Sequence, residues 1–305
     1  MISLFFWAIL SANYLSTDKS ETDLKKKTTL REGQIKVNNL NLHYREWGCS
    51  GLPPLLILHG LTGHVWEFDS LAMGLADHFH VIVVNQRGHG ASDWAEDYSA
   101  EIMADDISGM INALELTNPY IIGHSMGGVN SWVFASGHAD KIAGLVIVDV
   151  NPKTITFPPM VEGFITALNS YADARYANSQ EAVADYLNGY SGNHRAALTS
   201  FVLNNLIEKP DGSWIWRFDA SGLMDWVKNA SGSEKEYWSA LRNIKCPTLI
   251  IRAENSPFTT ESDMNRMQSI LPGAQLVEIS DSGHDLHIDQ LDVLAEVLKK
   301  FFKLH

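Results

Sequence analysis

Six short and almost continuous apolar runs recur along the chain, separated by longer segments of mixed polarity. Apolar runs of this length, without polar alternation, are typical of strands that are buried on both faces of a sheet. They predict strands at residues 54–58, 80–85, 119–123, 144–149, 247–252 and 275–280.

Between these runs, apolar residues are spaced as on one face of a helix, for example in residues 102–116. Strands that alternate with helices are joined by right-handed crossovers, which produce a mostly parallel sheet with helices on both faces. An antiparallel hairpin precedes this region, because two alternating runs in residues 33–48 are broken by the turn pair Asn38-Asn39. We therefore predict an α/β fold.

One interval is different: about 100 residues separate the fourth run from the fifth, far more than one crossover helix needs. Its aromatic residues include Phe157, Phe164, Tyr171, Tyr176, Tyr186, Tyr190, Trp214, Trp216, Trp226 and Trp238. We predict that residues 152–242 form a helical cap over the carboxyl ends of the strands, where open α/β proteins bind ligands. Most of these aromatic side chains are expected in the core of the cap, and aromatic residues of the cap, the tryptophans among them, are also expected to line an apolar pocket.

The chain begins with an apolar run in residues 1–10, followed by a polar stretch in residues 16–33. The run has the length of a signal-peptide core, but no Lys or Arg precedes it and no clear cleavage site follows it. A removed export signal and an amphipathic segment that packs on a surface both stay open, and the missing signal features favour a cytoplasmic location. We treat residues 1–32 as separate from the core, which comprises residues 33–151 and 243–305.

Composition and charge argue against several classes of protein. The 23 Lys and Arg against 36 Asp and Glu give a net charge of −13, which repels nucleic acid and anionic lipid. No run approaches the ~20 apolar residues of an integral membrane span. The two cysteines, Cys49 and Cys246, have no metal-ligand spacing, so neither a zinc site nor a disulfide scaffold is expected.

The most specific motif is Gly-His-Ser-Met-Gly at residues 123–127, between a strand and a helix. A nucleophile on such a sharp turn needs small neighbours, because the backbone is strained and passes close to the next strand. We expect Ser125 to be the nucleophile. The backbone N–H of Met126 is then one of the two donors that an acyl-transfer site needs for the developing oxyanion.

The second oxyanion donor is expected in the loop of residues 59–63, which directly follows the first strand of the parallel sheet. We assign this role to the backbone N–H of Leu61 and expect His59 to order the loop. The general base is expected in the loop after the last strand, where His284 follows Gly283. His287, three residues later, is better suited to a packing role at the start of a helix.

The loop at His59, the Arg-Gly-His-Gly turn at residues 87–90, the elbow at Ser125 and the late Gly283-His284 pair occur in this order. Together they resemble the α/β-hydrolase superfamily from about residue 35 to the end of the chain. The resemblance implies the α/β-hydrolase fold with a helical cap and a serine hydrolase. The serine at the elbow argues against the branches of the superfamily that use an Asp nucleophile. No metal or organic cofactor is implied.

The acid of the triad departs from the common family pattern. Family members often place it after the strand that follows the cap, where this sequence has Ser256. A serine cannot carry the negative charge that stabilises imidazolium. We predict that the acid is Asp149, at the end of the strand before the cap, as in a subset of the superfamily. Glu254 is the alternative, and Ser256 is expected to support the hydrogen-bond network.

These features predict a carboxylesterase that cleaves small to medium acyl esters through an acyl-enzyme on Ser125. A lactonase, a thioesterase and a hydrolase of carbon–carbon bonds remain alternatives on the same triad. A small-ligand receptor with little turnover is the alternative outside the enzymes. The expected partner is a small-molecule acyl ester or lactone, not a nucleic acid, and the sequence does not determine the oligomeric state.

Overall fold

The computed structural model describes residues 30–138, 140–231 and 234–304. The predictions for the apolar run of residues 1–10, and for nearly all of the polar stretch after it, lie outside the described residues. Within the described ranges, no helix is long and apolar enough to cross a membrane.

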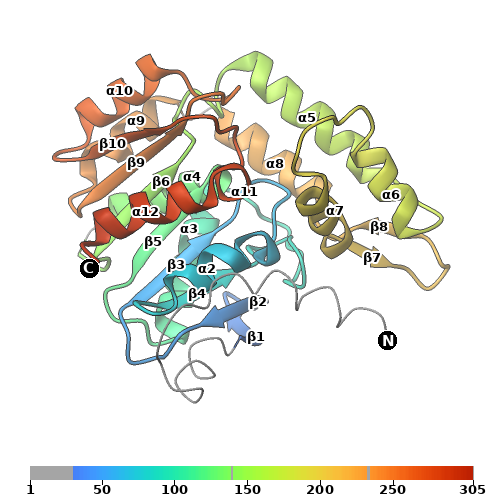
Figure 1. Ribbon diagram of the computed structural model, residues 1–305, viewed down its shortest axis with the longest axis horizontal. Helices are drawn as coiled ribbons and strands as arrows, with labels where there is room; N and C mark the ends of the chain where they lie inside the picture. Colours follow the sequence, from blue (N-terminus) through green and yellow to red (C-terminus); the bar gives the residue numbers. More distant parts are fainter. Residues whose placement is uncertain (1–29, 139, 232–233, 305) are drawn as a thin grey trace.

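An eight-stranded sheet with the spatial order β1-β2-β4-β3-β5-β6-β9-β10 forms the centre of the molecule (Figure 1). Its strands are β1 (Arg31–Val37), β2 (Leu40–Trp47), β3 (Pro54–Leu58), β4 (His80–Val84), β5 (Tyr120–His124), β6 (Gly144–Val148), β9 (Thr248–Ala253) and β10 (Gln275–Ile279). The strands from β4 to β10 are parallel, and β2 is antiparallel to both β1 and β4. The predicted α/β fold is confirmed, and each of the six apolar runs forms a strand whose ends shift by at most one residue.

The hairpin of β1 and β2 turns where the sequence predicts it. Asn38 and Asn39 have φ values of 49° and 66°, both in the left-handed region. A tight two-residue hairpin turn that follows the natural twist of the strands requires positive φ at both residues. Asparagine adopts this conformation more readily than most other residues.

The central strands are apolar at every position because they contact two hydrophobic layers. In β3, Leu56 and Leu58 belong to one layer, whereas Leu55 and Ile57 belong to the other. The first layer is formed with α3 (Ala100–Ala113), α4 (Met126–Gly137), α9 (Glu234–Asn243) and α10 (Glu261–Ile270). The second is formed with η1 (Val65–Phe68), α2 (Asp69–Leu75), α11 (Leu286–Asp289) and α12 (Leu291–Phe302).

The long interval between β6 and β9 contains more than helices. Its elements before α9 are α5 (Pro158–Ala172), α6 (Ser179–Tyr186), α7 (Arg195–Asn204), β7 (Leu206–Glu208), β8 (Trp214–Trp216) and α8 (Ala220–Ser231), which Figure 1 shows gathered beside the main sheet. The small antiparallel pair β7-β8 was not predicted. Its turn closes through Gly212, which has a φ of 83°, and the sequence Pro210-Asp211-Gly212 carries the corresponding turn signal.

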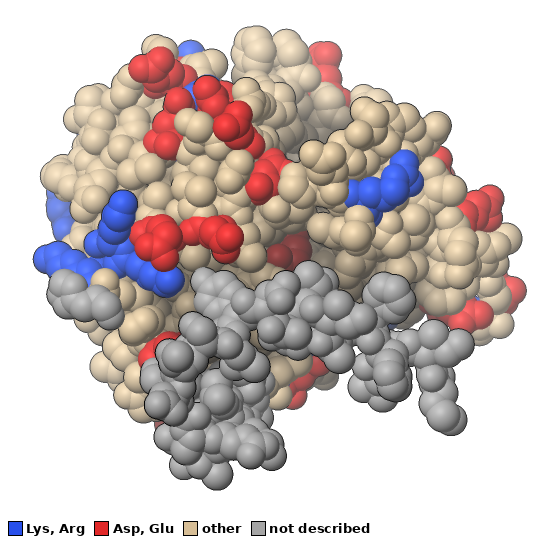
Figure 2. Space-filling view, viewed as in Figure 1, with Lys and Arg blue, Asp and Glu red and all other residues tan. Residues whose placement is uncertain are grey.

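The surface charge is unevenly distributed. On the face shown in Figure 2, several Lys and Arg side chains lie next to one another at the left edge, and most of the other charged side chains on view are acidic.

The Arg-Gly-His-Gly turn after β4 is fixed by a buried ion pair. Arg87 binds Asp106 of α3 through two hydrogen bonds, Nε to Oδ2 at 2.6 Å and Nη2 to Oδ1 at 2.8 Å. Both side chains are almost fully buried, at 4% and 6% exposed. The turn also contacts the segment between β6 and β9, because Asp219 donates its backbone N–H to Gly88 O. The turn therefore connects the sheet, α3 and that segment.

We predict that Asp106→Ala lowers the free energy of unfolding by about 3–5 kcal/mol, because it leaves a buried guanidinium without its partner. Denaturant unfolding measures this change. Asp225→Ala is the control: Asp225 is 61% exposed and pairs with Lys228 at 3.6 Å, so its loss is expected to change stability by at most about 0.5 kcal/mol. Equal changes in the two variants would contradict this assignment.

Candidate active site

Ser125 occupies the turn between β5 and α4, with a φ of 52° and a ψ of −118°. A residue other than glycine with positive φ is strained and must be held by its surroundings. The backbone N–H of Ser125 donates to Val148 O at 3.0 Å, and the N–H groups of Gly128 and Val129 close the turn on Ser125 O. These bonds keep the side chain of Ser125 at the carboxyl end of β5, where it lines a pocket.

The two glycines of the motif are required by close backbone packing. A Cβ atom on Gly123 would lie 2.4 Å from Gly127 O, and a Cβ atom on Gly127 would lie 2.4 Å from Leu58 O. Neither backbone oxygen can move without breaking the sheet or the first turn of α4. The Gly-x-Ser-x-Gly pattern is therefore a packing requirement of this strained turn.

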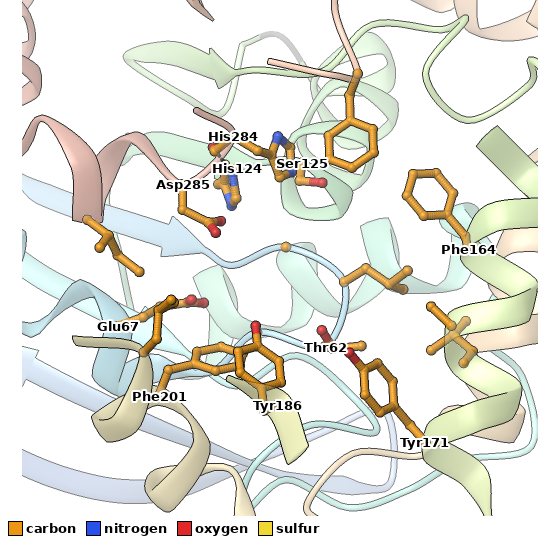
Figure 3. A pocket seen from close by; sticks show the side chains of 18 residues that line it. Thr62, Glu67, His124, Ser125, Phe164, Tyr171, Tyr186, Phe201, His284 and Asp285 are labelled. Atoms are coloured by element: carbon orange, nitrogen blue, oxygen red, sulfur yellow. Dashed lines mark hydrogen bonds between the residues drawn. The ribbon is translucent and has the colours of Figure 1, made fainter. Parts of the chain in front are cut away.

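His284 follows β10 and lines the same pocket as Ser125. Its Nδ1 lies 2.7 Å from Oδ2 of Asp149, the fully buried residue that follows β6. A carboxylate oxygen accepts this bond, so the hydrogen is on Nδ1 and the lone pair of Nε2 is free to accept a proton. Figure 3 shows the Ser125 hydroxyl next to the His284 ring. The structure thus brings together the three residues predicted as a triad.

Asp149 receives three further hydrogen bonds. Ser256 Oγ donates to Oδ2 at 2.6 Å, Thr259 Oγ1 donates to Oδ1 at 2.7 Å, and the backbone N–H of Ala253 donates to Oδ1 at 3.1 Å. Ser256, at the common family position of the acid, thus acts as a donor to Asp149. All three donors lie at the end of β9 or in the loop after it.

Glu254, the alternative acid, is in a different place. Its side chain is exposed, and Oε2 accepts a hydrogen bond from the backbone N–H of Asp281 at 2.9 Å. This bond connects the loop after β9 to the start of the loop that carries His284. The Nδ1 of His284 is already bound to Asp149.

Of the two residues expected to provide the oxyanion donors, Leu61 lines the pocket and Met126 directly follows Ser125. Met126 is the first residue of α4, so its N–H has no acceptor within the helix. Leu61 lines the pocket from the opposite loop. His59 orders that loop: its Nδ1 donates to Gly60 O at 2.8 Å, and its Nε2 accepts from the backbone N–H of Gln86 at 3.0 Å. Burial lowers the pKa of His59 to about 4, so the ring is neutral at pH 7.

The pocket has a volume of about 220 Å³ and a wall of mixed polarity. Its apolar and aromatic side chains are Leu61, Phe164, Ala167, Leu168, Tyr171, Tyr186, Leu198, Phe201, Phe258 and Ile288. Phe164, Tyr171 and Tyr186 of the predicted cap line the pocket, as expected of cap aromatic residues, but the prediction is wrong for the tryptophans, since none of the four is a lining residue. Trp216, Trp226 and Trp238 are buried in the hydrophobic core, where their large side chains fill space between helices.

The remaining wall is polar and was not predicted. It carries Glu67, His124 and Asp285, which Figure 3 shows below and beside the His284 ring. Next to it lies His287, which is buried, stacks on Phe68 and has Nε2 3.4 Å from Glu67 Oε2. No spacing in the sequence indicates this group, because its members come from η1, β5 and the loop before α11.

The charges of this wall are set by burial and pairing. Burial disfavours an ionised Glu67, but the His287 imidazolium outweighs it and lowers the pKa of Glu67 to about 2. Burial likewise disfavours a charged His287, but the Glu67 carboxylate raises the pKa of His287 above its ordinary value. Burial, together with the neighbouring His284 and His287, holds the pKa of His124 well below its ordinary value. Glu67 is therefore a carboxylate at pH 7, and His124 is neutral.

Comparisons with known proteins agree with this architecture. The family model of the α/β hydrolase fold matches residues 53–291. The sn-1-specific diacylglycerol lipase of Mus musculus is 28% identical over 259 residues, covering 83% of this chain and 82% of that protein. The 2-(acetamidomethylene)succinate hydrolase of Mesorhizobium japonicum is 28% identical over 274 residues, covering 88% and 94%. A solved structure of a marine microorganism esterase has a TM-score of 0.71 and 30% identity, and it covers 85% of this chain and 98% of that one.

The matched residues 53–291 extend from before β3 to the start of α12, so they contain the elbow, the buried acid and the late histidine. The chain belongs to the α/β-hydrolase fold family.

Proposed function

We propose that the protein is a serine carboxylesterase that cleaves small to medium, uncharged acyl esters through an acyl-enzyme on Ser125. The observation that carries this proposal is the 2.7 Å hydrogen bond between His284 and the buried Asp149, in a pocket that Ser125 also lines. This bond fixes the ring and the tautomer that a general base needs.

In the proposed reaction, Ser125 Oγ bonds to the acyl carbon while its proton passes to Nε2 of His284. The backbone N–H groups of Leu61 and Met126 stabilise the negative oxygen of the tetrahedral intermediate. His284 then gives the proton to the departing alcohol. A water molecule then bonds to the acyl carbon while His284 accepts its proton; the bond between Ser125 Oγ and the acyl carbon breaks, His284 returns the proton to Oγ, and the carboxylic acid leaves. Asp149 stabilises the imidazolium in each half.

The size and charge of the pocket support the substrate class. A volume of about 220 Å³ is below the ~300–1,000 Å³ that is common for drug-sized ligands. Among the described residues that line the pocket there is no Lys or Arg, whereas Glu67 and Asp285 are acidic. A carboxylate on the substrate would be desolvated beside like charges.

The two curated relatives are named for substrates that differ in charge. A diacylglycerol is an uncharged ester, whereas 2-(acetamidomethylene)succinate is a dicarboxylate. The acidic wall favours a substrate of the first kind. Lactones and thioesters without a negative charge fit the same chemistry, and activity profiling across the three classes separates them.

We predict that Ser125→Ala and His284→Ala each lower kcat by at least ~10³-fold, because each removes one half of a single proton-transfer step. The double variant is expected to be about as slow as the slower single variant. Steady-state kinetics on a short-chain aryl ester measure these losses. Losses that multiply in the double variant would show that the two residues act independently.

We also predict that Asp149→Asn lowers kcat by up to ~10⁴-fold, since the amide removes the charge and can hold the wrong imidazole tautomer. Glu254→Gln is the matched control and is expected to leave kcat nearly unchanged. Thermal melts of both variants check folding, because Asp149 is fully buried. An inactive Glu254→Gln with an active Asp149→Asn would move the acid to the loop after β9.

The acidic wall leads to a prediction about substrate charge. We expect kcat/KM for an aryl butyrate to exceed that for the aryl hemisuccinate of equal chain length by at least ~10-fold, a difference of about 1.4 kcal/mol in binding the transition state. Asp285→Asn should reduce this ratio. Asp211→Asn, in the turn between β7 and β8, changes the net charge equally and should preserve it. Equal rates on the two esters in the unmodified protein would refute the expectation.

A further inference from the structure

The polar wall of the pocket brings three side chains with metal-binding atoms together: His124, Asp285 and His287. One ring nitrogen of each histidine and one carboxylate oxygen of Asp285 lie within 4.8 Å of one another. Figure 3 shows the His124 ring and the Asp285 carboxylate facing the same space. Two imidazoles and a carboxylate are a donor set that Zn²⁺ and similar divalent transition metals prefer.

The hydrogen bonds of His124 leave one nitrogen available. Its Nε2 lies 3.0 Å from His284 O, and because a carbonyl oxygen only accepts, the hydrogen must be on Nε2. Nδ1 therefore keeps its lone pair. His124 is 4% exposed, and Nδ1 has no hydrogen-bond partner among the described residues. Buried polar atoms without a partner are rare, so this lone pair is suited to a ligand that enters the pocket.

His287 Nε2 is the second candidate ligand atom, and it must release the proton that it holds in its pairing with Glu67 before it can bind a metal ion. The residue is 5% exposed, and its Nε2 has no hydrogen bond within the described part of the chain. The nearest charged group is Glu67 Oε2 at 3.4 Å, an ion-pair contact without hydrogen-bond geometry. Because Glu67 also lines the pocket, a second carboxylate stands at the edge of the same cluster.

We propose that His124, Asp285 and His287, with Glu67 as the fourth ligand, form a binding site for Zn²⁺ or a related divalent transition metal. Ligand atoms around a tetrahedral zinc ion are about 3.3 Å apart, so the three side chains must approach one another by up to about 1.5 Å. Asp285 can make most of this movement by rotating its side chain, which is not buried. A metal ion can reach the site through the pocket beside Ser125.

A metal ion at this site inhibits ester hydrolysis, a consequence that rests on the proposed function. The rings of His124 and His284 have centroids 4.6 Å apart, and His124 holds the backbone of His284. An ion bound to His124 and Asp285 occupies part of the pocket. It also displaces residues on either side of His284, the proposed general base.

Metal binding is tested on the full chain after removal of metals with a chelator. Isothermal titration with Zn²⁺ gives stoichiometry and affinity, and the visible absorption bands of added Co²⁺ report nitrogen and oxygen ligation. We expect one Zn²⁺ per chain, with affinity at least ~10-fold weaker in both Asp285→Asn and His287→Gln. His138→Gln, on the outer end of α4, is the matched histidine control and should bind as the unmodified protein does.

The results of these experiments distinguish the metal site from its inhibitory role. No stoichiometric Zn²⁺ binding by the unmodified chain, or equal affinity in Asp285→Asn, overturns the site. If His287→Gln does not fold, as a thermal melt would show, Asp285→Asn alone decides, because its side chain is not buried.

Where the chain hydrolyses an aryl ester, saturating Zn²⁺ should stop turnover, and a chelator should restore it. Zn²⁺ binding without this inhibition overturns the inhibitory role, and a chain that binds Zn²⁺ but hydrolyses no ester contradicts the proposed function while the site stands.

Discussion

The carboxylate of Asp149 is fully buried between three segments of the chain, and a charge in that position must be paired. Its four donors come from the end of β9 and the loop after it, and from the loop that carries His284. Satisfying this one charge therefore fixes both loops relative to β6. Since β5 pairs with β6, the histidine held by Asp149 is placed beside the serine at the end of β5.

The same arrangement explains why the sequence departs from the common pattern. With Asp149 after β6 as the catalytic acid, as we propose, the position after β9 does not need a charge, but it needs a donor that reaches the buried carboxylate. Ser256 and Thr259 supply two hydroxyl donors at that place. Ser256 was expected to support the network, whereas nothing in the spacing singled out Thr259, because its role depends on the path of the loop.

Local signals in the sequence predict the parts of the fold that local forces determine. The strands follow from continuous apolar runs, and the first hairpin from Asn38 and Asn39. The elbow follows from glycines whose Cβ atoms would collide with backbone oxygens. The shape of the pocket was not predictable in this way: aromatic residues of the cap, the tryptophans among them, were expected in its wall, but the wall contains Phe164, Tyr171 and Tyr186 and none of the four tryptophans. Which aromatic residue faces the pocket depends on how α5, α6 and α7 pack, and one sequence does not determine that.

The pocket has two electrostatic parts with different origins. Around the triad, the Asp149 carboxylate and Nδ1 of His284 have hydrogen-bond partners that fix their orientation. The wall formed by Glu67, His124 and Asp285 has negative charge and an unpartnered buried nitrogen. Burial alone would neutralise Glu67, but the pairing with His287 keeps it ionised. Under the proposed function, this wall disfavours negatively charged substrates and takes no direct part in the reaction.

The central claim is that Ser125 carries the acyl group during turnover. The most direct measurement is rapid quenching of the protein during hydrolysis of an aryl butyrate, followed by intact-mass analysis and peptide mapping. The account predicts a single added butyryl group on the peptide that contains Ser125, and none in Ser125→Ala. A butyryl group on another residue, or full turnover by Ser125→Ala, would contradict the account.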